Sequence, residues 1–348
     1  MAKKSKKKDA PQSSEQQEWV RPAFMLGIDL GGTKILAAVV DHEGRIIGSA
    51  KRKTHAERGV DEVIDRIAKT ARDAVADAHL EMSQIWAVGI GAPGVADYSA
   101  GVIEFAPNLA NWVNVALGPR LHNLLGVPVF VENDVNAGTY GETAVGAARG
   151  YRSVLGIFPG TGIGGGIIID GRLLRGAHNA GAEVGHMVVM IDGPLCGCGR
   201  RGCIEALASR TAIERDLIGE IHAGRSTVIE KMVDLSTTGQ ITSGVLKAAL
   251  DEHDSLVTDI LERAAYHLGV FTASLVNALD PECIIYGGGL IEACGDYLLP
   301  IISDTMYRFL IRPVDPDKLP VLPAALGDNA VLLGAAMLAR ASLSEAAQ

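Results

Sequence analysis

The chain has 348 residues, of which 48% are hydrophobic and 21% are charged, and its formal net charge is −9. This length allows two domains with separate cores, and the composition is that of an ordinary globular protein. The negative charge argues against nucleic acid as the main partner, and no apolar run approaches the roughly 20 residues that span a bilayer.

Residues 1–23 differ from the rest of the chain. Five lysines come first, and a polar stretch without hydrophobic periodicity follows them. This composition predicts a disordered tail, although a basic tail can also contact an acidic surface or nucleic acid. The segment lacks the apolar core of a secretory signal, so we expect a cytoplasmic protein without a membrane partner.

The first predicted strand, 24–30, enters the glycine loop Gly31-Gly32-Thr33-Lys34, and a second strand over 35–40 leaves it. The same pattern returns about 130 residues later, with strands at 154–158 and 167–169 around a second glycine loop. Two units of strand, glycine loop and strand predict a duplicated α/β lobe.

Helices and strands alternate through the rest of the chain. Hydrophobic spacing predicts helices over 60–79, after 134, over 256–279 and over 330–341, and strands over 85–90, 127–131 and 283–286. Residues 210–255 match no motif and are expected to be helical and peripheral. Because glycines follow several of the strands, we expect a ligand at the carboxyl ends of the strands.

Two glycine segments, 29–34 and 160–166, offer backbone N–H groups that a phosphate can approach closely. Neither has the Gly-Lys-Ser/Thr of a Walker loop before a helix, and neither opens the helix that a dinucleotide fingerprint requires. A tight hairpin is the alternative for each loop alone. Two such loops in corresponding places, together with Gly287–Gly289, favour nucleotide binding.

Asp134 follows the predicted strand 127–131, where a side chain can be fixed at a cleft. A carboxylate there can accept the proton of a substrate hydroxyl that attacks phosphorus. The alternative is a helix N-cap, but Asn133 and Asp134 cannot both be the cap, so one side chain remains for another role. The polar groups suited to the hydroxyls of a polyol are Asn108, Asn133, Glu183 and Glu205.

Residues 181–205 hold the most specific pattern. Three cysteines fall within eight residues, and a histidine lies ten positions before the first of them. Three thiolates and one imidazole complete a tetrahedral zinc site without an open position, which predicts a structural metal that fixes Glu183 and Glu205. The alternative is three small buried residues in a glycine-rich turn. The predicted ligands are His186, Cys196, Cys198 and Cys203.

Together these motifs resemble the ROK family of sugar kinases, most of all its bacterial ATP-dependent glucokinases. The matching stretches are 29–34, 91–94, 107–109 with Trp112, 132–137, 160–166, 183–186, 196–205 and 287–289. The resemblance implies a two-lobed actin- and hexokinase-like fold of the ribonuclease-H type with a structural zinc site. It divides the chain into a small α/β domain, 24–138 plus 329–348, and a large one, 139–328, that carries the zinc.

The resemblance also implies roles for residues. Asp134 is the expected catalytic base. The expected sugar ligands are Asn108, Asn133, Asp134, Glu183, His186 and Glu205. The residues expected around the phosphates are Asp29, Gly31, Gly32, Thr33, Lys34, Gly160, Thr161, Gly162, Gly164, Gly287, Gly288 and Gly289. ATP with Mg²⁺ and a structural Zn²⁺ are the expected cofactors, and a homodimer or homotetramer is the expected assembly.

These features predict phosphorylation of glucose to glucose 6-phosphate by ATP. Fructose, mannose or an N-acetylhexosamine is the alternative acceptor, because the sugar-contacting residues are largely shared across the family. The family includes sugar-sensing repressors with a helix-turn-helix domain of several dozen residues, whereas only about 25 residues precede the first strand here. Polyphosphate is an alternative donor, but members that use it tend to lack the cysteine cluster.

Overall fold

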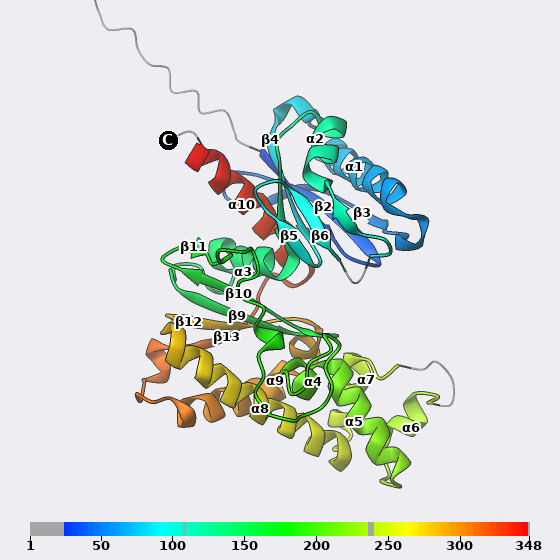
Figure 1. Cartoon of the computed structure of the whole chain (residues 1–348), viewed down its shortest axis with the longest axis vertical. Coiled ribbons are helices and arrows are strands. Elements are labelled where there is room, and N and C mark those ends of the chain that lie inside the picture. Colours follow the sequence, from blue (N-terminus) through cyan, green and yellow to red (C-terminus); the bar gives the residue numbers. More distant parts are fainter. Residues whose placement is uncertain (1–23, 107–108, 236–239, 347–348) are drawn as a thin grey trace, which may run out of the picture.

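The computed structural model describes residues 24–106, 109–235 and 240–346, whose elements form two lobes, one above the other in Figure 1. The predicted tail, 1–23, and the predicted sugar ligand Asn108 lie outside these described residues. Within the described part, no helix is long and apolar enough to cross a membrane. Strands and helices in both lobes confirm the predicted α/β class.

The upper lobe is built on a sheet of β1 Phe24–Leu30, β2 Lys34–Val40, β3 Ile46–Lys53, β4 Ile85–Ala92 and β8 Val129–Asn133. Their order is β3-β2-β1-β4-β8, with the first three antiparallel and β1, β4 and β8 parallel. A second, antiparallel sheet consists of β5 Val95–Asp97, β6 Val102–Phe105 and β7 Val113–Val115.

Helices cover both faces of the upper sheet, namely α1 Val60–Asp77, α2 Leu117–Leu125 and α10 Ala330–Ala346. Short 3-10 turns lie at Ala56–Arg58 and Met82–Gln84. Successive residues of a strand point to opposite faces, so Leu26 of β1 packs in the core with α1, whereas Met25 packs with α10. A side chain at Gly27 would collide with the carbonyl oxygen of Leu332, so α10 fits the sheet closely. The last helix of the chain thus belongs to the lobe of the first strand.

The lower sheet consists of β9 Val154–Pro159, β10 Ile163–Ile169, β11 Arg172–Leu173, β12 Cys283–Tyr286 and β13 Val321–Pro323. Its order is β11-β10-β9-β12-β13, with β9, β10 and β11 antiparallel and β9, β12 and β13 parallel. Strand for strand, this repeats the order and directions of the upper sheet. The predicted duplication is therefore confirmed in the topology of the sheets.

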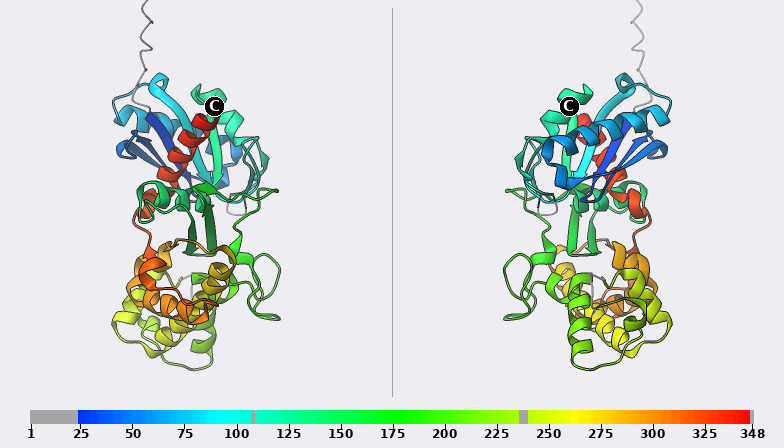
Figure 2. Two further views of the ribbon diagram at one scale, coloured as in Figure 1. Left: turned by 90° about the vertical axis from the view of Figure 1, so that its left-hand side faces the viewer. Right: turned by 90° about the vertical axis from the view of Figure 1, so that its right-hand side faces the viewer.

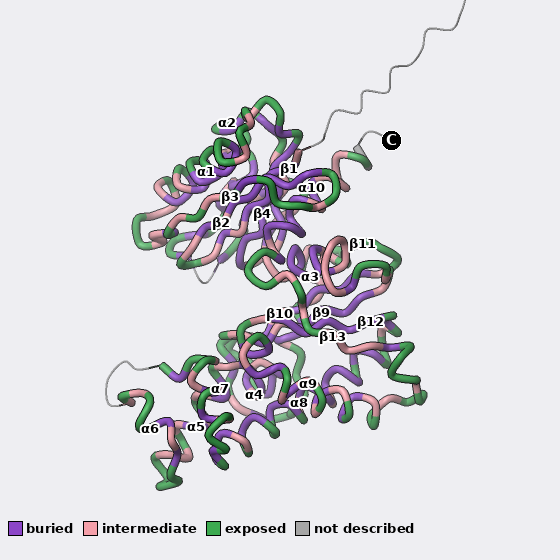
Figure 3. Tube along the Cα trace, turned by 180° about the vertical axis from the view of Figure 1, so that it is seen from behind, coloured by how far each residue is buried: buried purple, intermediate pink, exposed green. Residues whose placement is uncertain are grey.

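The helices of the lower lobe are α4 Glu205–Ala208, α5 Arg210–His222, α6 Ile229–Met232, α7 Ser243–Asp251, α8 Ser255–Leu279 and α9 Gly289–Phe309. Short 3-10 turns lie at Val184–His186, Pro316–Lys318 and Gly327–Asn329. The core forms where α8 and α9 pack beneath the sheet around Phe271 and Tyr286, and its buried segments are purple in Figure 3. The predicted helical character of 210–255 is confirmed by α5, α6 and α7. The long loop between β11 and α4 extends to one side of this lobe (Figure 2).

Helix α3, Asp134–Val145, lies between the lobes and packs against both α10 and β10 (Figure 1). The predicted domain boundary after residue 138 falls inside this unbroken helix. The division into 24–138 plus 329–348 and 139–328 stays a prediction. Because α3 directly follows β8, its first residues are held at the carboxyl end of a parallel strand, facing the other lobe.

Candidate active site

Both lobes contribute to one cavity of about 190 Å³ beside the start of α3. The upper lobe supplies Asp29 at the end of β1, and the lower lobe supplies Phe158 of β9. The other polar or turn residues that line the cavity include Asp134, Gly288, Glu292 and Asp328. The ends of separate chain segments thus meet at one site, as expected for strands whose carboxyl ends share an edge.

The structure decides which residue caps α3. The Oδ1 of Asn133 accepts hydrogen bonds from the backbone N–H groups of Val135 at 2.9 Å and Asn136 at 3.1 Å. The Nδ2 of Asn133 donates to the carbonyl oxygen of Gly94 at 3.2 Å. Asn133 is therefore the N-cap, and the carboxylate of Asp134, which accepts one hydrogen bond from Val135 N–H at 2.9 Å, is left for chemistry.

Burial raises the pKa of Asp134 to about 6, and the negative charge of Glu183 adds to the rise, against the hydrogen bond from Val135. Burial also raises the pKa of Asp29 to about 7, helped by the charge of Asp134 and opposed by Lys34. Two carboxyl groups in one cavity thus titrate near neutral pH. A carboxyl group with a pKa near 6 is mostly ionised at pH 7, so Asp134 can accept a proton.

Lys34 forms an ion pair of 2.7 Å with Asp328, which lies in the turn just before α10. Asp328 and Glu292 also line the cavity, although neither is among the site residues predicted from the sequence. An acidic residue directly after Gly327, at the start of the last helix, was the available signal for Asp328. Asp328 reaches the cavity because α10 packs on the upper lobe, and local sequence patterns do not reveal this packing.

Two of the three predicted glycine segments reach this cavity, the first through Asp29 and the third through Gly288, whereas the second follows shortly after the lining residue Phe158. In the first, Gly31 N–H donates to the carbonyl of Lys34 at 2.9 Å, which closes the hairpin and leaves Gly32 and Thr33 exposed. A Cβ atom built on Gly288 would lie 2.8 Å from the carbonyl oxygen of Pro159, so the third segment packs against the second. Such close approach, with a φ of 81° at Gly288, requires glycine.

Glycines 164–166 lie inside strand β10 rather than in a loop, which corrects the predicted strand start at residue 167. A Cβ atom on Gly164 would lie 2.5 Å from Cγ2 of Val135, next to Asp134. These glycines therefore let the strand approach α3, a packing role that the sequence pattern does not distinguish from a phosphate loop. The tip of the loop is Gly160-Thr161-Gly162, of which Thr161 is exposed and the two glycines are half-buried.

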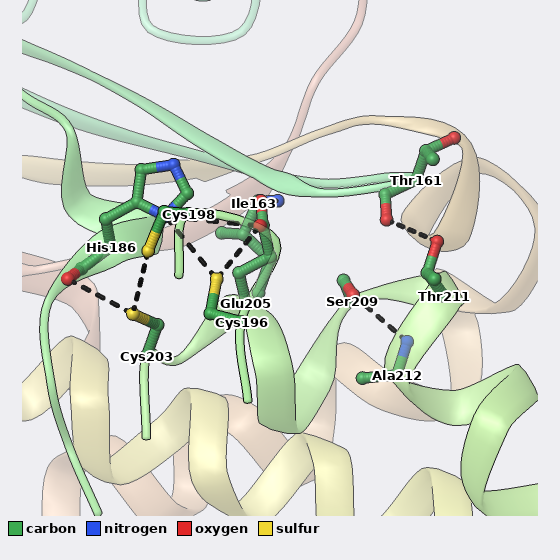
Figure 4. Close-up of polar contacts among 10 residues, drawn as sticks. All are labelled: Thr161, Ile163, His186, Cys196, Cys198, Cys203, Glu205, Ser209, Thr211 and Ala212. Carbon is green, nitrogen blue, oxygen red and sulfur yellow. Dashed lines mark hydrogen bonds and ion pairs between the residues drawn. The ribbon is translucent and has the colours of Figure 1, made fainter. Parts of the chain in front are cut away.

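The four predicted zinc ligands come together in the long loop (Figure 4). Their ligand atoms lie within 4.8 Å of one another. Cys196 Sγ is 3.7 Å from His186 Nδ1, and Cys198 Sγ is 3.7 Å from Cys203 Sγ. Thiolates about 2.3 Å from a tetrahedral zinc lie about 3.8 Å apart, so these residues fit the metal. Zinc bound at Nδ1 of His186 would leave Nε2 for another partner.

Glu205 lies between this cluster and the second glycine loop. Its Oε2 accepts a hydrogen bond from Ile163 N–H at 3.0 Å, and its Oε1 accepts one from the Cys196 thiol at 3.4 Å. The same Oε1 is 4.0 Å from His186 Nδ1. Of the other predicted sugar ligands, Glu183 is exposed and near enough to raise the pKa of Asp134.

Residues 25–342 match the model of the ROK family. The chain is 36% identical to the glucokinase of Thermotoga maritima, over 90% of this chain and 96% of that protein. It is 30% identical to the xylose repressor of Bacillus subtilis, over 90% of this chain and 76% of the repressor. A crystal structure of a ROK family glucokinase from Streptomyces griseus in complex with glucose and AMPPNP matches with a TM-score of 0.78 and 37% identity, covering 92% of this chain and 100% of the other. The chain therefore belongs to the ROK family, and the two-lobed fold that the sequence predicts is confirmed.

Proposed function

We propose that the protein is an ATP-dependent glucokinase that forms glucose 6-phosphate, with Asp134 as the general base. The observation that carries the proposal is the half-buried side chain of Asp134 at a cavity lined by both lobes, where loss of solvent raises the pKa of its carboxyl group to about 6. The likeness to glucokinases of about the same length supports the proposal, as does the relative that binds glucose and AMPPNP.

In the proposed reaction, the carboxylate of Asp134 accepts the proton of the sugar hydroxyl while that oxygen attacks the terminal phosphorus of ATP. The bond from this phosphorus to the bridging oxygen breaks, and ADP leaves. The cap formed by Asn133 fixes the backbone at Asp134, which holds the base in one position. The backbone N–H groups of Gly32 and Thr33, and those of Thr161 and Gly162 in the second loop, would hold the phosphates. Asp29 offers the carboxylate oxygen that Mg²⁺ prefers, and Mg²⁺ bound with ATP neutralises phosphate charge.

We also propose that His186, Cys196, Cys198 and Cys203 hold a structural zinc ion. The complete set of four ligands suits a closed site, so the metal would stabilise the long loop and take no part in the reaction. His186 and Glu183 would then present polar groups to the sugar, together with Asn108 and the second Nδ2 proton of Asn133, whose Oδ1 caps α3. An assembly of two or four chains and a cytoplasmic location remain predictions.

The test is a coupled assay of the purified protein with ATP and glucose, fructose, mannose or N-acetylglucosamine. Sites built to bind a hydroxyl leave polar groups unpaired with an analogue that lacks it. We expect kcat/KM for glucose to exceed that for fructose and N-acetylglucosamine by at least ~10²-fold. If fructose or N-acetylglucosamine is turned over faster than glucose, that sugar and not glucose is the preferred substrate. If no hexose is turned over, the kinase proposal is overturned.

A further inference from the structure

The segment 203–211 connects the cysteine–histidine cluster to the second glycine loop (Figure 4). We propose that this cluster, when it holds its metal, fixes the shape of loop 160–163 and so sets the affinity for ATP. The inference rests on the proposed function, because it assigns the ATP phosphates to this loop. It makes Glu205, Arg210 and Thr211 positioning residues for the donor.

The first connection is the carboxylate of Glu205. One oxygen accepts the hydrogen bond from Ile163 N–H at 3.0 Å, where the loop becomes strand β10. The other oxygen faces the cluster, 3.4 Å from Cys196 Sγ. Glu205 follows Cys203 by two residues, so a ligand of the proposed metal lies beside it in the chain as well as in space.

The second connection is the start of α5. Arg210 N–H donates to the carbonyl oxygen of Gly160 at 2.9 Å, and the hydroxyl of Thr211 donates to the carbonyl oxygen of Thr161 at 2.8 Å. Ser209 caps this helix by accepting a hydrogen bond from Ala212 N–H at 3.1 Å, which fixes the direction of the helix. The segment thus holds the loop at Gly160, at Thr161 and at Ile163.

The loop has little internal support of its own. Inside the turn 160–162, a backbone hydrogen bond runs from Gly160 N–H to the carbonyl of Gly162 at 2.8 Å, and Ile163 pairs with Pro159 of β9. Glycines lose more conformational entropy on ordering than other residues, so an unsupported loop of this kind would sample many shapes. External hydrogen bonds order it before the ligand arrives, and a preorganised site binds more tightly.

The cluster lies at the other end of the same segment. Without a shared metal, the side chains of the cluster have weak contacts of 3.7 Å with one another, and Cys203 Sγ donates to the carbonyl oxygen of His186 at 3.5 Å. Loss of the metal would leave residues 196–203 with these contacts and their backbone hydrogen bonds, such as that from Cys196 N–H to the carbonyl oxygen of Arg200 at 2.8 Å, and would loosen the orientation of Glu205. The loop 160–163 would then lose its contact at Ile163, and ATP binding would weaken.

The sharpest test is Thr211→Val, because this exposed residue lies outside the proposed sugar-binding set. The variant keeps the shape of the side chain and loses the hydrogen bond to Thr161. A hydrogen bond of this kind is worth about a 2- to 12-fold change in an equilibrium constant. We expect KM for ATP to rise about 3- to 10-fold, with KM for glucose within about twofold of wild type and an unchanged zinc content.

The matched control is Thr70→Val in α1, which also removes a threonine hydroxyl bonded to a backbone carbonyl, that of Arg66 at 2.7 Å, but far from the loop. It should leave both KM values unchanged. Equal rises of the two KM values in Thr211→Val, or no change in the KM for ATP, would overturn the inference.

A second experiment measures hydrogen exchange and ligand binding, and it does not depend on catalytic turnover. Hydrogen exchange of the amides of residues 161–163 is measured in wild type, in Thr211→Val and in protein stripped of zinc by a chelator. AMPPNP and glucose binding are measured by calorimetry. We expect faster exchange in both altered proteins and a larger loss of affinity for AMPPNP than for glucose. Metal-free protein that stays folded and binds AMPPNP as wild type does would refute the coupling, and if it unfolds, the Thr211→Val result decides. A protein with the expected exchange pattern but no kinase activity would contradict the proposed function alone.

Discussion

Asp134 has a half-buried side chain, and loss of solvent raises the pKa of its carboxyl group to about 6. A general base works only when ionised, so kcat/KM for the sugar should fall as the pH drops below about 6 and level off above it. Asp134→Asn keeps the shape and removes the basicity, and we expect kcat to fall by ~10²–10⁴-fold while glucose still binds. Steady-state kinetics from pH 5 to 8 with calorimetry of glucose binding checks this. If the variant keeps more than a tenth of the wild-type kcat, Asp134 is not the general base.

The raised pKa of the second carboxyl group, that of Asp29, should make the stability of the protein depend on pH. Burial is the main reason why this pKa is about 7 in the folded protein, well above its ordinary value of 3.8. The folded state therefore holds this proton to higher pH than the unfolded state, and the protein loses stability as pH rises from about 4 to 7. Asp29→Asn has no such charge, so we expect its urea midpoint to exceed that of wild type more at pH 8 than at pH 5. An equal difference at both values would contradict the buried carboxylate.

At the scale of elements, Glu142 near the end of α3 forms hydrogen bonds with both segments in which the chain passes between the lobes. Its buried carboxylate accepts hydrogen bonds from Ala147 N–H at 2.8 Å, just after α3. It also accepts from Ala325 N–H at 2.9 Å and Leu326 N–H at 2.8 Å, in the segment between β13 and α10. One side chain thus satisfies three backbone donors in two segments that are far apart in sequence.

We therefore expect Glu142→Ala to be among the more destabilising substitutions. A fully buried donor left without a partner costs about 1–3 kcal/mol, and because these three donors are only partly buried, we expect a total loss of about that size. Urea unfolding monitored by circular dichroism measures the loss. Glu252→Ala, at an exposed position after α7, is the control and should change stability little. A Glu142→Ala variant as stable as the control would mean that water replaces the carboxylate at these donors.

The elements were largely predictable because their signals are local. Apolar runs followed by glycine mark β1, β9 and β12, and the cysteine spacing marks the cluster, independently of distant contacts. The choice of Asn133 over Asp134 as the cap needed backbone geometry, since both residues suit that position. The hydrogen bonds of Arg210 and Thr211 to the glycine loop lie in a stretch without any motif, and only folding brings them to residues some 50 positions away.

At the scale of the whole molecule, one ion pair connects the lobes beside the proposed active site. Arg175, in the loop after β11, donates from Nε to Glu132 of β8 at 2.7 Å, and its guanidinium lies 5.6 Å from the ring centre of Tyr98. Glu132 is almost fully buried, and its other oxygen accepts from Asn136 Nδ2 at 3.1 Å. A contact between a loop of one lobe and a strand of the other limits how far the lobes can separate.

Phosphoryl transfer needs a site from which water is excluded, since bound ATP would otherwise be hydrolysed. The predicted phosphate segments lie on different lobes, 29–34 on the upper and 160–166 on the lower. We therefore expect the lobes to close on the sugar, and small-angle scattering should show a smaller radius of gyration with saturating glucose than without it. An unchanged radius, with binding verified by calorimetry, would count against closure.

The ion pair between Arg175 and Glu132 predicts that a substitution of Arg175 alters the sugar-free protein more than the sugar-bound protein. Arg175→Gln loses the ion pair to Glu132, so the sugar-free protein should separate its lobes further and have a larger radius than wild type. Glucose binding should still bring the lobes together, so the bound radius should match wild type, while KM for glucose rises because more of the binding energy is spent on closure. Arg172→Gln, on β11 but without an ion pair among the described residues, is the control. Equal sugar-free radii for both variants would show that Arg175 does not restrain the lobes.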